Sequence, residues 1–316
     1  MQFETGWVRI ASSALNFDQC PNEDAKRAGS DARSGEAKRM EESGINIQQI
    51  FTPPVVVIVA HPDDETIGAG AQLAGMRERA GAAVIIHVTD GSPRNLSDAL
   101  AAGFATRESY ARARRQELFA ALGLAGISAE QTREIGLVDQ EAMFNLLPLS
   151  LQIAGLLAEI RPSVVLTHPY EGGHPDHDAT AFAVHTACEL LAKRAVANGA
   201  PPAIIEMASY HNRGGVMVTG DFLPDQFCGE IKVVLTEEQR DLKRRMIDCF
   251  VSQREVLQLF PTGVEKFRRA PRYDFTRPPH AGDLLYERAG WGISGDDWRA
   301  RAREAIDVLD AGAAIG

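Results

Sequence analysis

The chain has 316 residues, of which 45% are hydrophobic and 24% are charged, a composition typical of a soluble globular protein. Its net charge of −10 disfavours a nucleic-acid partner, because an acidic surface repels phosphates. No continuous apolar run approaches the roughly 20 residues that cross a bilayer, and the N-terminus lacks the pattern of a signal peptide. We therefore expect a cytoplasmic protein with no membrane association.

The pattern of apolar residues predicts a polar N-terminal extension followed by alternating strands and helices. Residues 1–50 form the extension, which we expect to be partly mobile because residues 18–44 contain almost no large apolar side chains. The expected strands are Val55–Ala60, Ala83–Val88, Glu134–Val138, Val164–Thr167, Ala203–Ser209, Gly215–Val218 and Glu230–Leu235. The expected helices are Thr66–Ala80, Thr106–Leu122, Leu146–Ile160, Ala179–Ala197 and a long helix from Thr236 to Phe260.

This alternation predicts an α/β fold: a doubly wound, mostly parallel open sheet flanked by helices, Rossmann-like in its layers. The main domain spans residues 51–260. Residues 261–316 are expected to form an irregular C-terminal extension that packs on it, since their first part is rich in proline and arginine with little periodicity. We expect the basic cluster in this extension to form a solvated surface; its members are Lys266, Arg268, Arg269 and Arg272.

Two segments at predicted strand ends carry the residue types that bind metals. His61-Pro62-Asp63-Asp64-Glu65 directly follows the first strand, and His174-Pro175-Asp176-His177 follows the strand Val164–Thr167 after a glycine-containing loop. Ligands of doubly wound folds bind beyond the carboxyl ends of the strands, so the fold can bring the two segments together. Either segment alone could be an acidic helix start. Buried side by side, so many carboxylates need a compensating cation.

The donor types in these segments match a catalytic zinc site. Two imidazoles and one carboxylate with an open coordination position are the usual ligands of catalytic zinc. A further carboxylate can act as general base, and a further histidine can stabilise the oxyanion or protonate the leaving amine. The sequence therefore predicts a zinc-dependent hydrolase of an amide, although such a site also accepts Fe(II) or another divalent ion. The four cysteines are far apart and suggest no cysteine zinc site.

The two motifs also resemble a known family. Val-Ala-His-Pro-Asp-Asp-Glu at 59–65, with His-Pro-Asp-His at 174–177, is similar to the LmbE-like (PIG-L type) N-acetylglucosaminyl deacetylases, which include the mycothiol and bacillithiol pathway deacetylases. The resemblance covers about residues 53–260. It implies metal-dependent hydrolysis of an N-acyl amide, expected to be N-acetyl, on an amino-sugar conjugate or related small molecule. The products are a free amine and a carboxylate.

Carried onto this sequence, the resemblance implies a role for each motif residue. The implied zinc ligands are His61, Asp64 and His177. Asp63 matches the general base, and His174 matches the histidine that assists the transition state. Asp176 is expected to orient His174. Glu65 is expected to tie the loop to the following helix.

Four further residues are expected to contact the substrate. Arg114 and Asp139 match family positions that contact the sugar. Asp90 follows the second strand and points toward the same edge of the sheet. Family members of the mycothiol type carry a tyrosine where this sequence has Gly172, and Tyr170 is the expected substitute.

The remaining histidines and the C-terminal tryptophans are expected mainly in structural or supporting positions. His87 is expected in the core, His168 beside the metal ligands, and His185 in a purely structural position. His211 is a candidate for lining the pocket. The C-terminal tryptophans, Trp291 and Trp298, are expected to pack in the core rather than stack on a sugar.

Three alternatives remain open from the sequence. The same zinc chemistry could act on a non-sugar amide. A doubly wound nucleotide-binding or oxidoreductase module is weaker, because it requires a glycine-rich turn after the first strand, where this chain has the histidine motif. A carbohydrate-binding protein that keeps the metal without catalysis is disfavoured by the intact Asp63. A homo-oligomer is compatible with the sequence, which does not specify the oligomeric state.

Overall fold

A computed structural model describes residues 46–76, 83–194, 201–225 and 228–313. Seven strands form one sheet, in the order β3 (Thr132–Asp139), β2 (Ala83–Pro93), β1 (Val55–Val59), β4 (Val164–Thr167), β5 (Ala203–Met207), β9 (Val264–Arg269) and β8 (Glu230–Val234). β1 to β5 are parallel, whereas β9 runs antiparallel to both of its neighbours. A separate hairpin joins β6 (Tyr210–Arg213) to β7 (Val216–Thr219). The predicted doubly wound, mostly parallel α/β fold is confirmed.

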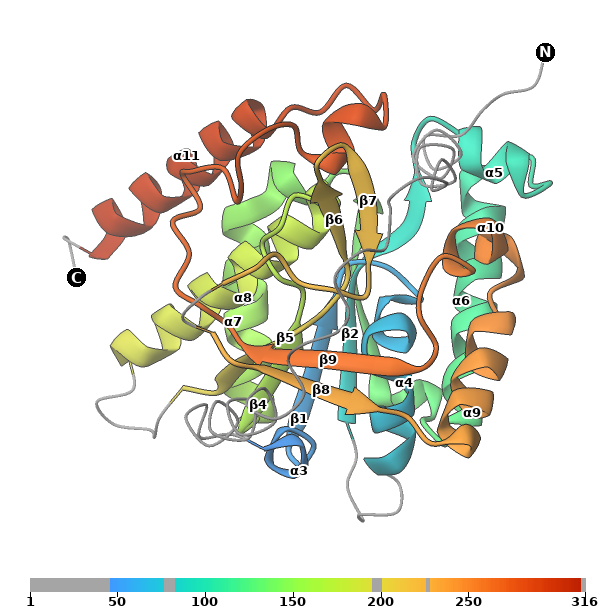
Figure 1. Cartoon of the computed structure of the whole chain (residues 1–316). Coiled ribbons are helices and arrows are strands. Elements are labelled where there is room, and N and C mark those ends of the chain that lie inside the picture. The colour runs from blue at the N-terminus through green and yellow to red at the C-terminus, as the bar shows by residue number, and fades with distance from the viewer. Residues whose placement is uncertain (1–45, 77–82, 195–200, 226–227, 314–316) are drawn as a thin grey trace, which may run out of the picture.

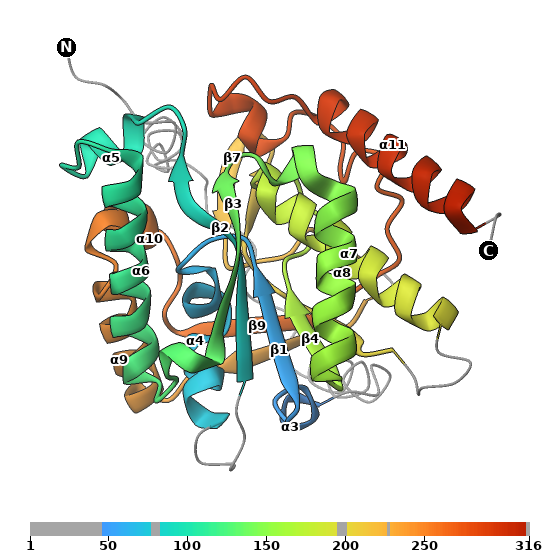
Figure 2. The same ribbon diagram turned by 180° about the vertical axis from the view of Figure 1, so that it is seen from behind.

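Helices cover both faces of the sheet (Figures 1 and 2). One face carries α4 (Asp64–Met76), α6 (Arg107–Leu124) and α9 (Glu237–Asp248). The opposite face carries α7 (Leu146–Ile160) and α8 (Pro175–Arg194), with α11 (Gly295–Ala313) packed against α7. Short helices complete the described part of the chain: α3 (Ile47–Ile50), α5 (Ser97–Ala101) and α10 (Arg254–Leu257).

The central strand β1 separates two hydrophobic cores. Its five residues are all buried, as expected for a parallel strand covered on both faces. Alternate side chains point to opposite faces of a strand. Val55, Val57 and Val59 therefore pack in the core under α4, α6 and α9. Val56 and Ile58 pack in the core under α7 and α8.

The order of the parallel strands in the sheet places the two histidine motifs side by side. β1 lies between β2 and β4, so the chain leaves β1 toward one side of the sheet and β4 lies on the other side. In a doubly wound sheet such a reversal leaves a crevice at the carboxyl ends of the two strands. His61 follows β1 and His174 follows β4, so both segments open into that crevice.

The helix predicted from Thr236 to Phe260 is divided into three parts. Thr236 caps α9 as expected, through a capping box with Gln239. The chain then leaves the helical conformation at Phe250, and the carboxylate of Glu117 binds both the amide and the hydroxyl of Ser252. This competing interaction interrupts the helical hydrogen bonds. A 3₁₀ turn and α10 follow and bring residues 253–260 over the crevice.

The C-terminal region is more regular than expected. β9 is an inner strand of the main sheet, between β5 and β8, and α11 is 19 residues long. The expected solvated surface is wrong for Arg268, which is only 3% exposed. Its guanidinium binds the carboxylates of Glu206 and Glu171, at 2.7 and 2.9 Å. Most of the expected N-terminal extension, residues 1–45, lies outside the described residues.

One helical stretch, Ala142–Ile160, is long and apolar enough to cross a membrane by length and composition alone. It is not a continuous apolar run, because Asn145, Ser150 and Gln152 interrupt it. Leu146, Leu149, Ile153 and Leu157 of this stretch are buried in the core shared with α8. A core helix of a soluble protein satisfies the same test of composition, and this packing accounts for the apolar residues on its buried face.

Candidate active site

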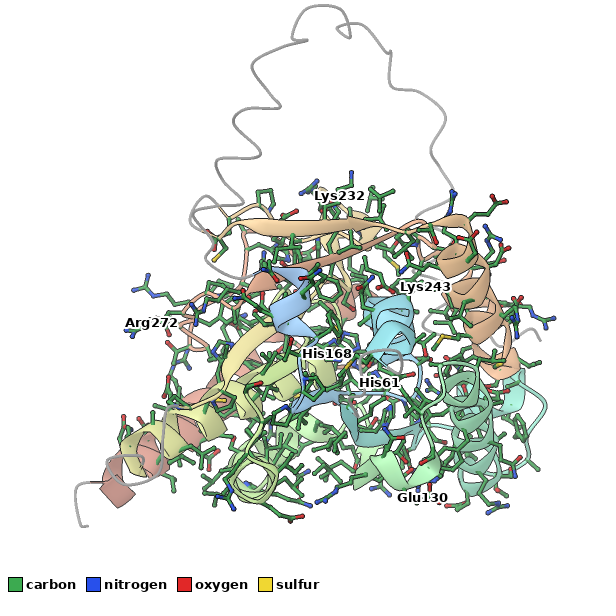
Figure 3. All side chains as sticks on the ribbon, turned by 90° about the horizontal axis from the view of Figure 1, so that it is seen from below. His61, Glu130, His168, Lys232, Lys243 and Arg272 are labelled. Atoms are coloured by element: carbon green, nitrogen blue, oxygen red, sulfur yellow. The ribbon has the colours of Figure 1, made fainter. Side chains whose placement is uncertain are left out.

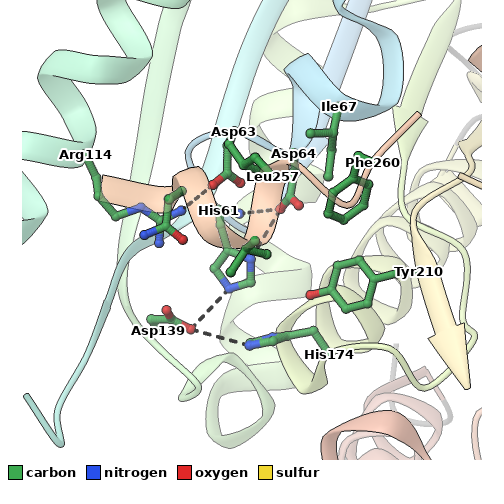
Figure 4. Close-up of a pocket in the computed structure, with 12 residues that line it drawn as sticks. His61, Asp63, Asp64, Ile67, Arg114, Asp139, His174, Tyr210, Leu257 and Phe260 are labelled. Atoms are coloured by element: carbon green, nitrogen blue, oxygen red, sulfur yellow. Dashed lines mark hydrogen bonds and ion pairs between the residues drawn. The ribbon is translucent and has the colours of Figure 1, made fainter. Parts of the chain in front are cut away.

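A pocket of about 360 Å³, counted with the open space at its mouth, lies at the carboxyl ends of the central strands (Figure 4). Its polar lining comes from the loops after β1 and β4, the start of α4, the end of β3, α6 and the 3₁₀ turn after α9. These residues are His61, Asp63, Asp64, Arg114, Asp139, His174 and Gln253. The remaining lining residues are Ile67, Tyr210, Val256, Leu257 and Phe260.

Three buried side chains at this pocket offer converging metal-ligand atoms, and two of them, His61 and Asp64, line it. His61, Asp64 and His177 each contribute one such atom, and these atoms lie within 4.8 Å of one another. Nδ1 of His61 is 3.3 Å from Asp64 Oδ2, and Nε2 of His177 is 3.2 Å from Asp64 Oδ1. Asp64 and His177 stand in the first turns of α4 and α8, so two helix starts hold the group together.

The second nitrogen of His61 is held by carboxylates. Nε2 is 3.2 Å from Asp139 Oδ1 and 3.3 Å from Asp176 Oδ2. Asp176 in turn accepts backbone hydrogen bonds from Gln140 and Ala142, at 2.6 and 3.0 Å. A carboxylate on the far nitrogen of a histidine commonly fixes its tautomer and direction at metal sites.

The Asp176 carboxylate contacts His61 and lies in the same buried group of side chains as His174. Its expected role in orienting His174 stays a prediction. The carboxylate faces His61, because the start of α8 turns it toward the loop after β3. His174 is held by the backbone amide of Asp176, which donates to its Nδ1 at 3.2 Å. With Nδ1 accepting, the neutral ring carries its proton on Nε2, which is 3.7 Å from Asp139.

Asp63 is held in an unusual backbone conformation next to Arg114. Its φ of 130° is rare for a residue other than glycine, and such conformations concentrate at functional sites. Its Oδ2 accepts a hydrogen bond from Arg114 at 2.7 Å. Burial raises the pKa of Asp63 to about 8, although the charge of Arg114 acts in the opposite direction.

Arg114 is used almost entirely inside the protein. Besides Asp63, its guanidinium donates to the backbone oxygens of Pro62, at 2.8 Å, and Gly91. Gly91 has a φ of 65°, and any side chain there would collide with the guanidinium. The structure thus places Arg114 in the pocket as expected, with most of its donors directed at the loop that carries Asp63 rather than at the open space.

The pKa values of His61 and His174 depend strongly on the charged side chains around them. Burial alone would lower the pKa of His61, but the carboxylates around it, with Asp139 first among them, raise that pKa well above its ordinary value. Burial and the neighbouring His61 lower the pKa of His174, although Asp139 opposes them. The site therefore concentrates negative charge around His61, as a cation site requires.

Further buried residues support the ligands from behind. The Glu65 carboxylate forms hydrogen bonds with the ring of His87, at 3.0 Å, and with the hydroxyl of Thr66, at 2.6 Å. These contacts agree with the expected position of Glu65 between the loop and the helix. His168 stacks on His177 with ring centroids 3.8 Å apart, and its Nε2 accepts from the amide of Ala60. Figure 3 shows His168 and His61 next to each other in the interior of the molecule.

Two residues expected to contact the substrate do not line this pocket. Tyr170 is only 3% exposed and packs against Phe275 and Trp298, and its hydroxyl donates to the backbone oxygen of Arg277. The expectation for Tyr170 is therefore wrong, because the chain before Gly172 turns it into the core. Asp90 pairs with Arg107 instead of reaching the pocket.

The most informative residue that sequence reasoning missed is Tyr210. It is the first residue of β6, its ring lies 5.0 Å from that of His177, and it lines the pocket. Gly173 allows this approach, because a side chain there would strike the backbone oxygen of Tyr210. Burial, followed by the charge of Asp64, raises the pKa of Tyr210 well above its ordinary value. Its position beyond a strand end was the signal available in the sequence.

Of the other histidines, His185 is half-buried beside Tyr273 and Phe275, in keeping with a structural position. His211, the candidate for lining the pocket, is buried and absent from the pocket lining. Trp298 is fully buried and donates from its ring nitrogen to Pro175, while the ring of Trp291 lies 4.8 Å from that of His174.

Comparison with known proteins identifies the family. Residues 56–188 match the family described as GlcNAc-PI de-N-acetylase, PIG-L. A relative from Bacillus subtilis (strain 168), named a probable N-acetyl-alpha-D-glucosaminyl L-malate deacetylase 2, is 32% identical over 205 residues, which are 64% of this chain and 83% of the relative.

The chain belongs to the PIG-L family of de-N-acetylases. It is thus an N-deacetylase, a hydrolase of amide bonds, and the alternative of a nucleotide-binding or oxidoreductase module has no support. A second relative of this PIG-L deacetylase, from Tsukamurella paurometabola, is named a 1D-myo-inositol 2-acetamido-2-deoxy-alpha-D-glucopyranoside deacetylase. It is 28% identical over 181 residues, which are 48% of this chain and 59% of that relative.

Solved structures share the fold of this PIG-L deacetylase. The A40926 pseudoaglycone deacetylase Dbv21 superposes with a TM-score of 0.53 at 22% identity, covering 69% of this chain and 97% of that protein. The teicoplanin deacetylase Orf2, in a form described as zinc inhibited, gives a TM-score of 0.52 at 19% identity, covering 70% and 98%. At these identities the likeness extends to the fold alone.

Proposed function

We propose that this PIG-L deacetylase removes the acetyl group from an N-acetylated amino-sugar conjugate or a related small molecule, using a divalent ion held by His61, Asp64 and His177. The observation that carries the proposal is the burial of these three side chains against one another, with Asp63 beside them in the same pocket. The names of the two relatives support an amino-sugar substrate, since both are described as deacetylases of glucosamine derivatives.

The donor set fits a divalent metal. Two imidazoles and a carboxylate match the ligands of a catalytic zinc ion, and we expect zinc, one per chain. When bound there, such an ion lowers the pKa of a coordinated water to about 7 and polarises a carbonyl group. Asp176 supports this assignment, because it fixes the far nitrogen of His61 and leaves Nδ1 to face the other two ligands.

The chain's own residues would then perform the proton transfers. The charge of Arg114, together with that of a bound divalent ion, would favour the ionised form of Asp63, which would then take the proton of the attacking water. Arg114 fixes this carboxylate through the 2.7 Å hydrogen bond. The Nε2–H of His174 would donate a hydrogen bond to the developing oxyanion, and Asp63 would pass the proton that it took from water to the leaving amine. Tyr210 is a second donor in the same pocket, since its raised pKa keeps the phenol protonated. The products are the free amine and acetate.

The proposed function also implies a location and a class of partner for the enzyme. We propose a cytoplasmic enzyme whose partner is a small N-acyl substrate. A nucleic-acid partner is disfavoured by the net charge of −10, and we propose no membrane association. A homo-oligomer stays compatible with the sequence.

The test replaces Asp63 with asparagine, which keeps the size of the side chain but removes the base. We expect Asp63→Asn to lose at least about 100-fold in kcat toward N-acetylglucosamine conjugates, while the purified protein retains its bound metal. Asp241→Asn, an exposed position on α9, is the matched control and should behave as the unmodified enzyme. Substantial activity in Asp63→Asn would refute Asp63 as the base, and hydrolysis of N-acetyl amino acids in preference to sugars would refute the substrate class.

A further inference from the structure

The lining of the pocket is divided between polar and apolar side chains (Figure 4). Asp63, Arg114 and Asp139 line one side. The apolar lining, called the apolar wall below, consists of Ile67, Val256, Leu257 and Phe260. Ile67 and Phe260 lie beyond Asp64 in the view of Figure 4. An amino-sugar conjugate offers hydroxyl groups, which need polar partners, whereas the acyl group offers only a hydrocarbon chain beyond its carbonyl. The two halves of the pocket thus match the two halves of an N-acyl sugar.

We propose that the apolar wall receives the acyl chain and that Phe260 ends this subsite, so that the enzyme selects short acyl groups. The inference rests on the proposed function, because it assumes that the amide is cleaved beside Asp63 and Asp64. Ile67 stands one helical turn after these residues on α4, which places the wall next to the bond that breaks.

The wall is fixed by the core behind it. Ile67, Leu257 and Phe260 all belong to the hydrophobic core under α4, α6 and α9. Phe260 is only 6% exposed, and its ring meets that of Tyr210 edge-on at 5.8 Å. Close-packed side chains of this kind do not move aside without cost, so a longer acyl chain meets a rigid obstacle.

Val256 is the one half-buried member of the wall. It lies one residue before Leu257 on α10, the short helix that the break after α9 brings over the pocket. A larger side chain at Val256 can fill part of the subsite from its half-exposed edge, with less disturbance of the core than a substitution at Phe260. It therefore offers a way to change the width of the subsite without disturbing the core.

The test measures kcat/KM for a series of glucosamine amides that differ only in acyl length: acetyl, propionyl, butyryl and hexanoyl. A hydrophobic pocket distinguishes one methylene group by about 10- to 200-fold. We expect the unmodified enzyme to lose at least about tenfold between acetyl and butyryl. Phe260→Ala should raise the butyryl-to-acetyl ratio at least about tenfold, and Phe260→Leu should give an intermediate ratio.

A matched control separates the subsite from general loosening of the protein. Phe275→Ala removes an equally buried phenylalanine, 7% exposed, from the other core. It should reduce stability but leave the ratio unchanged. If Phe260→Ala does not fold, Val256→Phe decides the matter, because it should narrow the subsite and lower the propionyl-to-acetyl ratio.

The outcomes distinguish this inference from the function on which it rests. An unmodified enzyme that cleaves no member of the series overturns both. Cleavage of the acetyl amide with ratios unchanged in Phe260→Ala, or in Val256→Phe where Phe260→Ala does not fold, overturns the acyl subsite alone. An equal change in KM for every acyl length also overturns it, because the wall would then contact the sugar.

Discussion

The contacts of Arg114 in the structure differ from the role that the sequence suggested for it. Its resemblance to a sugar-contacting position suggested a role in binding. In the folded chain its guanidinium is buried against Asp63, Pro62 and Gly91. A residue that fixes the base acts on the rate of the chemical step more than on the affinity for substrate.

We therefore predict that Arg114→Lys lowers kcat by about 10- to 100-fold, while KM changes by less than about threefold. Lysine keeps the charge but cannot bind the carboxylate and two backbone oxygens at once. Arg115→Lys, at the neighbouring half-exposed position, is the control and should be neutral. Steady-state kinetics decide between the roles, since a rise in KM at constant kcat would show that Arg114 mainly binds the sugar.

The sequence predicted the residues of the pocket that lie directly beyond strand ends. His61, Asp64, His174 and His177 needed only the two strand positions and the rule that ligands gather at their carboxyl ends. The partner of Asp176 and the burial of Tyr170 could not be predicted, because both depend on how the loop after β4 turns. Their directions are decided by contacts with the loop after β3 and with the C-terminal segment.

Among the elements, β9 was the least predictable. Its sequence, Val-Glu-Lys-Phe-Arg-Arg, is rich in charged residues and predicts an exposed segment. In the structure it is an inner strand of the sheet. The charges are tolerated because partners from distant elements meet them: Lys243 on α9 for Glu265, and Glu206 on β5 for Arg268. By contrast, β1, β4 and α7 were predicted almost to the residue, since their patterns reflect burial by local neighbours.

The pair formed by Lys243 and Glu265 also fixes α4, the helix that presents Asp64. Lys243 donates to the backbone oxygen of Ile67 at 2.8 Å, and Glu265 accepts from the amide of Ala71 at 2.9 Å. Both side chains are fully buried. Removal of one member of such a pair leaves an uncompensated charge in the core.

We predict that Lys243→Met lowers the free energy of unfolding by about 3–5 kcal/mol, as measured by urea denaturation. Adding Glu265→Gln should recover part of the loss, because it removes the unpaired charge. Lys232→Met, at an exposed position on β8 (Figure 3), serves as the control and should change stability by less than about 0.5 kcal/mol. A loss of less than about 1 kcal/mol in Lys243→Met would contradict the account of this pair.

At the scale of the whole molecule, two cores share one sheet, and a half-buried histidine packs beside the second core. His185 lies on α8 against Tyr273 and Phe275, and burial lowers its pKa to about 4. The unfolded chain takes up a proton at its ordinary pKa near 6.5, so between pH 6.5 and 4 it binds more protons than the folded chain. The neutral ring of His185 therefore contributes to the free energy of unfolding above pH 6.5. This contribution is lost as the pH falls from 6.5 toward 4.

The stability of the protein should accordingly depend on His185 in acid. Between pH 7 and pH 5, we predict that the unmodified protein loses about 2 kcal/mol more than His185→Phe does. Each protein is compared with itself by urea denaturation at the two pH values, so that the direct cost of the substitution cancels. Identical pH dependence in both proteins would contradict the lowered pKa.

The central claim is that the buried group of His61, Asp64 and His177 holds the metal on which deacetylation depends. The most direct test removes metal with a chelator and then titrates zinc while both bound zinc and amine release from N-acetylglucosamine conjugates are measured. We predict that the metal-free protein is inactive, and that activity returns with binding and reaches its maximum at about one equivalent per chain. His177→Ala should bind zinc at least about 100-fold more weakly. Full activity in the metal-free protein, or unchanged zinc affinity in His177→Ala, would contradict the claim.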